Sequence, residues 1–247
     1  MPTIVGQSYW KASRAPRYSL LFALPLLLAY ETLAAILPVQ ETHGVRNGAD
    51  VMIKSIFTLL LGRWGPLAFG VALVVGCLWL VRRDFGLHGG GLRARVFGGM
   101  ALESIGLALV FGVVVGIVTA RLLGALHLLA IAPVAQLDVP TRLMVSLGAG
   151  LYEELLFRVV LVSGLAAIAR ALFAWSARAA GIFAVLLGAL VFSAFHYIGA
   201  YGDAFTIQSF TFRLIGGVFF SALYLLRGFG IDAWTHALYD VLLLFQG

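Results

Sequence analysis

Long apolar stretches, separated by short polar segments, dominate the pattern along the chain. A run of about 20 apolar residues is long enough to cross the hydrocarbon core of a bilayer as an α-helix. The pattern therefore predicts an all-α membrane protein, a polytopic bundle of about seven (six to eight) transmembrane helices. The predicted spans cover residues 18–37, 64–81, 96–120, 142–165, 181–198, 208–226 and 231–245, the last being short for a full crossing.

The segments between these runs predict connections and one or two short interfacial helices. Residues 51–62 are amphipathic and can lie at the membrane surface, and residues 121–141 predict a connecting loop with a second such helix. Residues 38–50 form a polar loop, and residues 166–180 a short amphipathic link. The three glycines at 89–91 predict a flexible turn, because no strand precedes them and no Lys-Ser/Thr follows, as a phosphate-binding loop requires.

Composition strengthens the membrane assignment. Hydrophobic residues make up 62% of the chain and charged residues 11%, with a mean hydropathy of +1.01, whereas soluble domains carry about 25% charged residues. No linker divides the chain, so residues 1–247 are predicted to form a single transmembrane domain. The single cysteine, Cys77, excludes an intramolecular disulfide and a cysteine-based metal site.

The net charge of +6 is distributed in a way that predicts orientation in a membrane rather than binding to nucleic acid. With an odd number of spans and a cytoplasmic N-terminus, ten basic residues fall inside, namely Lys11, Arg14, Arg17, Arg82, Arg83, Arg93, Arg95, Arg170, Arg178 and Arg227. Five fall outside, namely Arg46, Lys54, Arg63, Arg121 and Arg142. This asymmetry predicts a multi-pass protein of the cell membrane, in bacteria the inner membrane, with the lipid bilayer as its partner.

The basic N-terminus followed by an apolar run also permits a signal peptide. A first transmembrane helix is preferred, because residues 18–37 are long enough to span and further spans follow.

The stretch from Gly148 to Arg158 places two carboxylates and a guanidinium inside an apolar run. Each charge in hydrocarbon costs about 3 kcal/mol on insertion scales. Glu154 and Arg158 are separated by four residues, so they lie on one helix face and can pair. Glu153 points about 100° away and becomes a candidate general acid or base. Alternatively, Glu153 pairs with another intramembrane charge, such as Arg213, and only holds helices together.

Two later spans carry further polar residues. A histidine near a helix end, such as His196, is most often a packing residue, but His236 and Asp240 lie four residues apart, so the carboxylate can orient the imidazole. Ionisable residues inside a membrane normally face the bundle interior and pair there. A carboxylate and an imidazole can activate a water molecule, while a second imidazole stabilises the developing oxyanion. The same groups could bind zinc, although no His-Glu-x-x-His is present.

Three motifs in order resemble those of the CAAX prenyl endopeptidase and bacteriocin-processing (CPBP, or Abi) family. They are Glu153-Glu154-x-x-x-Arg158, Phe192-x-x-x-His196 and His236-x-x-x-Asp240. The resemblance covers residues 143–247, while residues 1–142 match only as generic spans. It implies a glutamic-type intramembrane endopeptidase without a metal or other cofactor, acting on membrane-associated proteins or peptides.

The resemblance also implies a role for each motif residue. Glu153 would act with His196 to activate water, with Glu154 and Arg158 as a supporting pair. His236 and the residue at position 240 would form the oxyanion site.

One residue and one position fit the resemblance poorly. The family often has Asn at position 240, whereas an ionised Asp240 cannot donate a hydrogen bond, so we expect it to orient His236. His196 falls near the outer side of its predicted span, away from Glu153, unless the link at 166–180 dips into the membrane or the fifth span begins later.

Two other functions stay open: a non-catalytic immunity or scaffold protein, and a proton-coupled transporter, for which no internal repeat is found.

Overall fold

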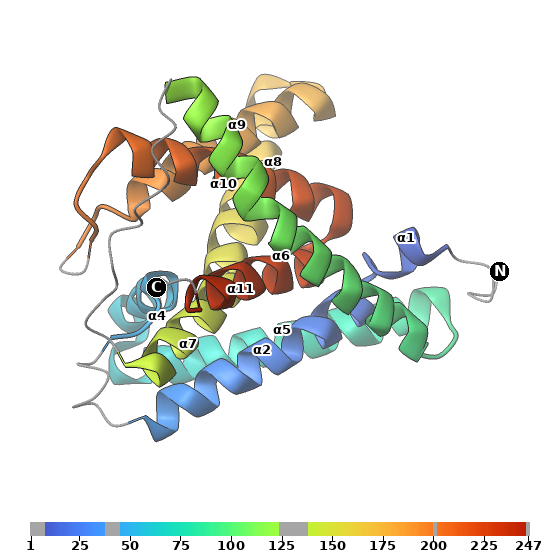
Figure 1. Cartoon of the computed structure of the whole chain (residues 1–247). Helices are drawn as coiled ribbons and strands as arrows, with labels where there is room; N and C mark the ends of the chain where they lie inside the picture. The colour runs from blue at the N-terminus through green and yellow to red at the C-terminus, as the bar shows by residue number, and fades with distance from the viewer. Residues whose placement is uncertain (1–7, 38–44, 124–137, 200–201, 246–247) are drawn as a thin grey trace.

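A computed structural model describes residues 8–37, 45–123, 138–199 and 202–245. Every regular element in this part of the chain is a helix, which confirms the predicted all-α class (Figure 1). The elements are α1 (Tyr9–Ala12), α2 (Pro16–Ile36), α4 (Gly48–Leu61), η2 (Gly62–Trp64), α5 (Gly65–His88), α6 (Ala94–Leu123), α7 (Val139–Gly148), η3 (Ala149–Val162), α8 (Ser163–Phe173), α9 (Ala177–Phe195), α10 (Ile207–Arg227) and α11 (Phe229–Leu243).

Six helical stretches within the described residues are long and apolar enough to cross a membrane, so the chain is a multi-pass membrane protein. They are Pro16–Ile36, Gly48–His88, Ala94–Leu123, Val139–Phe173, Ala177–Phe195 and Ile207–Arg227. The predicted last span is not among them. It corresponds to α11, which has 15 residues.

The helix α11 is a central element of the bundle. It packs against α6, η3, α2, α10 and α7, and Figure 1 shows it crossing the middle of the molecule. Ile231 and Ala233 are fully buried, and so is the acidic residue Asp232. Nearly all residues from Gly230 to Ala237 are buried. The short apolar run therefore marks a buried core helix.

Several predicted boundaries are wrong. The second span continues past Arg82 and Arg83 to His88, because the basic side chains lie on an exposed face and do not interrupt the helix. Asp50 is not in a loop: it lies in the first turn of α4 and is fully buried. The link expected at 166–180 is mostly helical, since α8 runs to Phe173 and α9 begins at Ala177. The interfacial helix expected at 121–141 lies largely outside the described residues.

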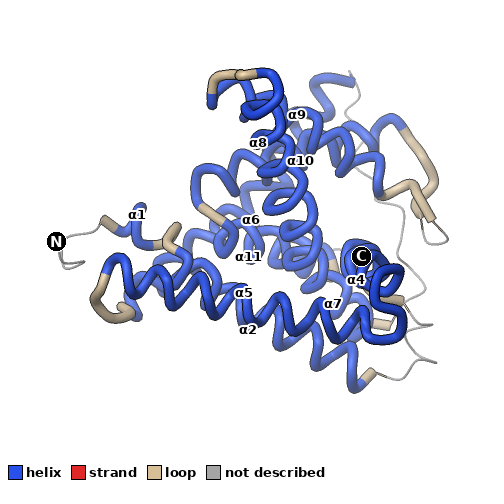
Figure 2. Tube along the Cα trace, turned by 180° about the vertical axis from the view of Figure 1, so that it is seen from behind, coloured by secondary structure: helices blue, strands red, loops and turns tan. Residues whose placement is uncertain are grey.

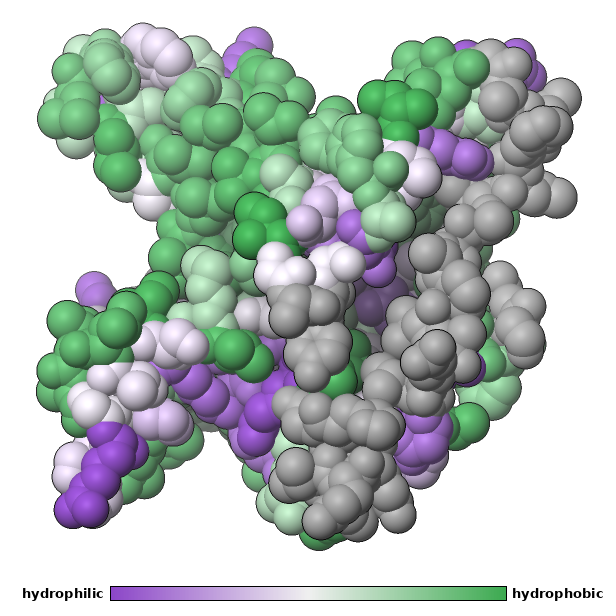
Figure 3. Space-filling view, turned by 90° about the vertical axis from the view of Figure 1, so that its left-hand side faces the viewer, coloured by the Kyte–Doolittle hydropathy of each residue, from purple (hydrophilic) through white to green (hydrophobic). Residues whose placement is uncertain are grey.

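The surface separates apolar from polar residues. Hydrophobic side chains cover the outer faces of the helices, as membrane lipids require, and hydrophilic side chains gather in a recess between the two groups of helices (Figure 3). In the view from behind, α2 and α5 extend along one edge of the molecule, and α8, α9 and α10 lie at the opposite edge (Figure 2). The three sequence motifs lie on η3, at the end of α9 and on α11, and η3 packs against both other helices.

Candidate active site

The first motif lies on a continuous helical run from Val139 to Phe173, whose middle part, η3, is a π-helix. Its hydrogen bonds join residues five apart: the backbone N–H of Ser163 donates to the carbonyl of Arg158. The α-helical geometry expected for this stretch is therefore wrong, although Glu154 and Arg158 still share a face. π-Helical turns occur frequently at functional sites. Here the π-helix holds three buried ionisable side chains, those of Glu153, Glu154 and Arg158.

Two glycines in this stretch allow neighbouring elements to approach it closely. A Cβ added at Gly150 would lie 2.3 Å from the backbone oxygen of Ala233 on α11. At Gly148 it would lie 2.5 Å from the Tyr30 ring and 2.8 Å from Cβ of Asn47. All three distances are far below van der Waals contact. A larger residue at Gly150 would push α11 away from the glutamates, and one at Gly148 would push away α2 and the start of α4.

Glu154 faces a closed set of partners. Its Oε2 lies 2.9 Å from Nε of Arg158, and its Oε1 lies 2.6 Å from Nδ1 of His236, which can donate a hydrogen bond to it. Arg158 packs its guanidinium over the ring of Phe192 at 4.3 Å, an arrangement that further stabilises the cation. Glu154 and Arg158 are both fully buried, so this carboxylate has little freedom to take part in a reaction.

Glu153 faces two elements that Glu154 does not contact. Its Oε1 accepts a hydrogen bond from Nδ2 of Asn47 at 2.8 Å. Its Oε2 lies 3.8 Å from Nε2 of His196, too far for a direct hydrogen bond. This oxygen is buried and has no donor among the described residues, although buried carboxylate oxygens are normally paired. One oxygen of Glu153 is thus anchored, and the other is available to a reactant.

The imidazole of His196 is oriented by its own helix end. Its Nδ1 lies 2.9 Å from the carbonyl oxygen of Phe192, and since a carbonyl can only accept, Nδ1 carries the hydrogen. In the neutral ring Nε2 is then an acceptor, directed towards Glu153. A neutral imidazole in this tautomer can accept a proton from a water molecule.

The length of the α8–α9 hairpin explains how His196 reaches Glu153. Glu153 lies 20 residues before the end of α8 (173 − 153), and His196 lies 19 residues after the start of α9 (196 − 177). At 1.5 Å per residue both lie about 30 Å from the turn. The sequence placed His196 and Glu153 at different depths in the membrane because the fourth span was predicted to end at residue 165, whereas the helix continues to Phe173. Neither a dipping link nor a later start of the fifth span is needed.

His236 lies close to acidic residues on two helices, η3 and its own helix α11. Besides the contact to Glu154, its Nε2 lies 3.7 Å from Oδ2 of Asp240, and its ring stacks on Phe220 at 4.5 Å between centroids. The fully buried Asp232 interacts electrostatically with Glu154 and has no other hydrogen-bond partner among the described residues. A protonated Asp232 can donate a hydrogen bond to Glu154.

The sequence missed two of these site residues. Asp232, His236 and Asp240 recur at intervals of four on one face of α11, so periodicity could have identified Asp232. Asn47 offers no such signal, because it is far from the motifs along the chain and precedes a helix whose pattern predicts an interfacial position.

The alternative pairing of Glu153 with Arg213 is wrong. Arg213 forms an ion pair with Asp203 in the loop after α9 and donates to Ser209 at 2.8 Å and to Tyr197 at 3.1 Å. The backbone N–H of Asp203 also donates to the carbonyl of His196 at 2.9 Å, so this cluster secures the chain around His196. Within the described residues, no three His, Cys, Asp or Glu side chains are grouped so that they could hold a metal ion.

Comparison with known proteins agrees with the motifs. Residues 135–242 match the family model described as type II CAAX prenyl endopeptidase Rce1-like, a segment that contains all three motifs. Searches of curated proteins and of solved structures give no match. The matched segment begins four residues before the helical run that carries Glu153 and ends within α11. Residues 135–242 therefore form an Rce1-like domain, in agreement with the family that the three motifs resemble.

Proposed function

We propose that the protein is an intramembrane endopeptidase in which Glu153 and His196 activate a water molecule for attack on a peptide bond. The observation that carries this proposal is the buried Oε2 of Glu153, unpaired and 3.8 Å from Nε2 of His196. Two acceptors at this separation can both hydrogen-bond one water molecule. Its proton passes to one of them as the oxygen attacks the carbonyl carbon of the substrate.

His236 is the group best placed to stabilise the oxyanion. Carboxylates lie on both sides of its ring, Glu154 at 2.6 Å from Nδ1 and Asp240 at 3.7 Å from Nε2. These charges favour the imidazolium form, which donates from both nitrogens. Nδ1 is held by Glu154, so Nε2 is the donor for the developing negative charge. Asp240 orients the ring, and Glu154 with Arg158 holds it in place.

The cycle then needs no covalent intermediate. Water adds to the peptide carbonyl, the tetrahedral intermediate collapses, and the proton held by Glu153 or His196 passes to the leaving amine. Membrane-associated proteins or peptides are the substrates that a site inside a helical bundle can reach. The basic residues predicted to be inside favour a cytoplasmic N-terminus.

The experiment is cleavage by the full chain in proteoliposomes, with Glu153→Gln as the test variant. The first probe is a farnesylated peptide ending in a CAAX sequence, chosen from the description of the matched family, alongside the same peptide without the lipid. Asp138→Asn is the matched control, because it makes the same acid-to-amide change at an exposed position preceding α7, on the same helical run.

We expect the control to cleave like the wild type and Glu153→Gln to fall by about 10²- to 10⁴-fold, the usual contribution of a general base. Cleavage of the unlipidated peptide would broaden the substrate class to unmodified tails. Undiminished cleavage by Glu153→Gln would refute the assigned role, and a folded wild type that cleaves neither probe would favour the scaffold alternative.

A further inference from the structure

Asn47 connects the N-terminal half of the chain to the carboxylate of Glu153. It is the N-cap of α4: its Oδ1 accepts from the backbone N–H of Ala49 at 3.0 Å and of Asp50 at 3.4 Å. Its Nδ2 donates to Oε1 of Glu153 at 2.8 Å, and the residue is 3% exposed. Because the cap requires the amide oxygen to face the helix, the NH₂ group must face Glu153.

We propose that Asn47 is a positioning residue for peptide-bond hydrolysis, holding one oxygen of Glu153 so that the other faces His196. The inference rests on the proposed function of Glu153. Asn47 lies outside residues 135–242, the segment that matches the family model. The N-terminal half would therefore contribute a residue of the site itself, in addition to the helices that surround the site.

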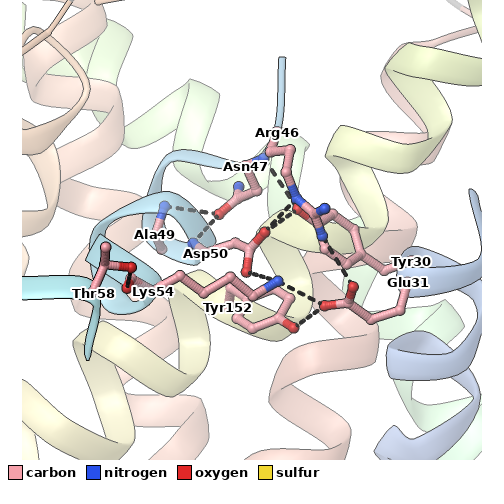
Figure 4. A network of polar contacts seen from close by, with 9 residues as sticks. All are labelled: Tyr30, Glu31, Arg46, Asn47, Ala49, Asp50, Lys54, Thr58 and Tyr152. Atoms are coloured by element: carbon pink, nitrogen blue, oxygen red, sulfur yellow. Dashed lines mark hydrogen bonds and ion pairs between the residues drawn. The ribbon is translucent and has the colours of Figure 1, made fainter. Parts of the chain in front are cut away.

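A polar network holds Asn47 in place (Figure 4). The hydroxyl of Tyr30 accepts from the backbone N–H of Asn47 at 3.3 Å and donates to Oδ2 of Asp50 at 2.8 Å. Arg46 lies 2.8 Å and Lys54 lies 2.6 Å from the two oxygens of Asp50. The first turn of α4 is thus fixed against α2, and the Asn47 side chain has one allowed orientation.

The same network reaches the π-helix next to Glu153. The hydroxyl of Tyr152 donates to Oε1 of Glu31 at 2.5 Å, and Glu31 also pairs with Arg46 and Lys54, each at 3.0 Å. Two acids, Glu31 and Asp50, balance two bases, so neither cation is left to compensate Glu153. Gly148 allows the close approach, since its missing Cβ would lie 2.8 Å from Cβ of Asn47.

Glu153 therefore depends on a neutral donor for one of its oxygens. A hydrogen bond to a carboxylate is about twice as strong as one between neutral groups, so the bond from Asn47 fixes the position of this oxygen. The other charged groups that act on Glu153 or its surroundings come from three elements: His196 on α9, Arg213 on α10, paired with Asp203, and His236 and Asp240 on α11.

The decisive variant is Asn47→Asp. Asp is as good an N-cap as Asn, so α4 is retained, but a second carboxylate oxygen now faces Oε1 of Glu153. Two carboxylates in contact cannot both ionise easily. Asn47→Ser is a milder variant, because its hydroxyl keeps the cap and is too short to replace the bond to Glu153. Ser176→Asp is the matched control: Ser176 caps α9 at the end opposite His196 and is exposed.

The first measurement needs no substrate. The full chain in lipid nanodiscs is examined by difference infrared spectroscopy, and the carboxylate bands of Glu153 are identified by their absence in Glu153→Gln. We expect these bands to shift in Asn47→Ser, because the carboxylate loses one charge-assisted hydrogen bond, and to change further in Asn47→Asp. Ser176→Asp should leave them unchanged. Wild-type bands in Asn47→Asp would overturn the proposal.

The second measurement is the pH profile of cleavage of the farnesylated CAAX peptide. Asn47→Asp should lower kcat, change the acid limb of the profile and leave KM unchanged, because two carboxylates in contact cannot both ionise easily, whereas a merely structural defect would lower the amount of active protein at every pH. If Glu153→Gln is inactive but Asn47→Asp keeps the wild-type kcat and acid limb, the positioning role fails and the proposed function stands. If Glu153→Gln is active, the proposed function itself fails.

Discussion

Glu153 and Glu154 are neighbours in the chain but lie in contrasting environments. Both oxygens of Glu154 are engaged, by Arg158 at 2.9 Å and His236 at 2.6 Å, and the residue is fully buried. Glu153 has one oxygen bonded to Asn47 and one without a donor among the described residues, 3.8 Å from His196. One carboxylate is fully paired within the bundle, and the other has one oxygen facing His196 without a hydrogen bond.

This contrast shows how a membrane bundle can hold a reactive carboxylate. A buried charge needs a partner, and Glu154 has two, which also fix His236. Glu153 is held by neutral or distant groups, so in the proposed mechanism one of its oxygens stays available to the water molecule that attacks the substrate. The proposed mechanism thus divides the stability of the site and its reactivity between adjacent residues.

The largest expected effect on stability comes from Glu154→Gln. It leaves Arg158 as an uncompensated buried charge, which we expect to lower the free energy of unfolding by about 3–5 kcal/mol. Glu153→Gln should change it by less than about 1.5 kcal/mol, because the amide oxygen can still accept from Asn47. Thermal unfolding in nanodiscs measures both. Equal destabilisation by the two variants would remove the distinction between the glutamates.

The next largest effect is expected at His196, whose Nε2 lies 3.8 Å from Oε2 of Glu153. His196→Gln should lower kcat by about 10²- to 10⁴-fold while the protein stays folded. His88→Gln is its control, since His88 lies half exposed at the end of α5, paired with Asp84. Cleavage of the farnesylated CAAX peptide in proteoliposomes provides the rates. A His196→Gln variant as active as the His88→Gln control would show that His196 is only a packing residue.

A smaller effect is expected at Asp240. Asn at this position keeps an amide oxygen beside the His236 ring, so Asp240→Asn should change kcat by less than about tenfold, or about 1.4 kcal/mol. His236→Gln, measured beside it, should cost far more, because the oxyanion donor is removed. If Asp240→Asn is as damaging as His236→Gln, the carboxylate takes part in the reaction directly.

The smallest effect is expected from chelation. A mechanism based on Glu153 and His196 needs no metal, so prolonged treatment with 1,10-phenanthroline should leave the cleavage rate unchanged. Loss of activity that added zinc restores would establish the zinc alternative, with the histidines and Glu153 as candidate ligands.

Hydrophobicity and local spacing were sufficient to predict the fold class and part of the site. Long apolar runs indicated the helical membrane class and most of the helices, and the interval of four between Glu154 and Arg158 indicated their pairing. The three motifs located polar side chains that the structure brings into contact or close to one another. These features depend on residues near one another in the chain, where periodicity is informative.

The remaining features of the fold and of the site could not be predicted from residues near one another in the chain. Asn47 approaches Glu153 only because α4 packs on η3, and its sequence neighbours reveal nothing of this. The π-helix and the full length of α8 were missed, since composition alone does not separate a π-helix from an α-helix or an amphipathic helix end from a link. The length of α8 had the largest consequence, because it places His196 level with Glu153.

The most direct test is the cleavage rate per folded molecule of Glu153→Gln and Glu154→Gln, measured together on the farnesylated CAAX peptide. Folded protein is quantified by size-exclusion chromatography of the nanodiscs, so that loss of stability is separated from loss of chemistry. We expect the fraction of Glu154→Gln that folds to retain measurable cleavage and Glu153→Gln to show almost none despite a normal folded yield. Efficient cleavage by folded Glu153→Gln would contradict the assignment of the reaction to this residue.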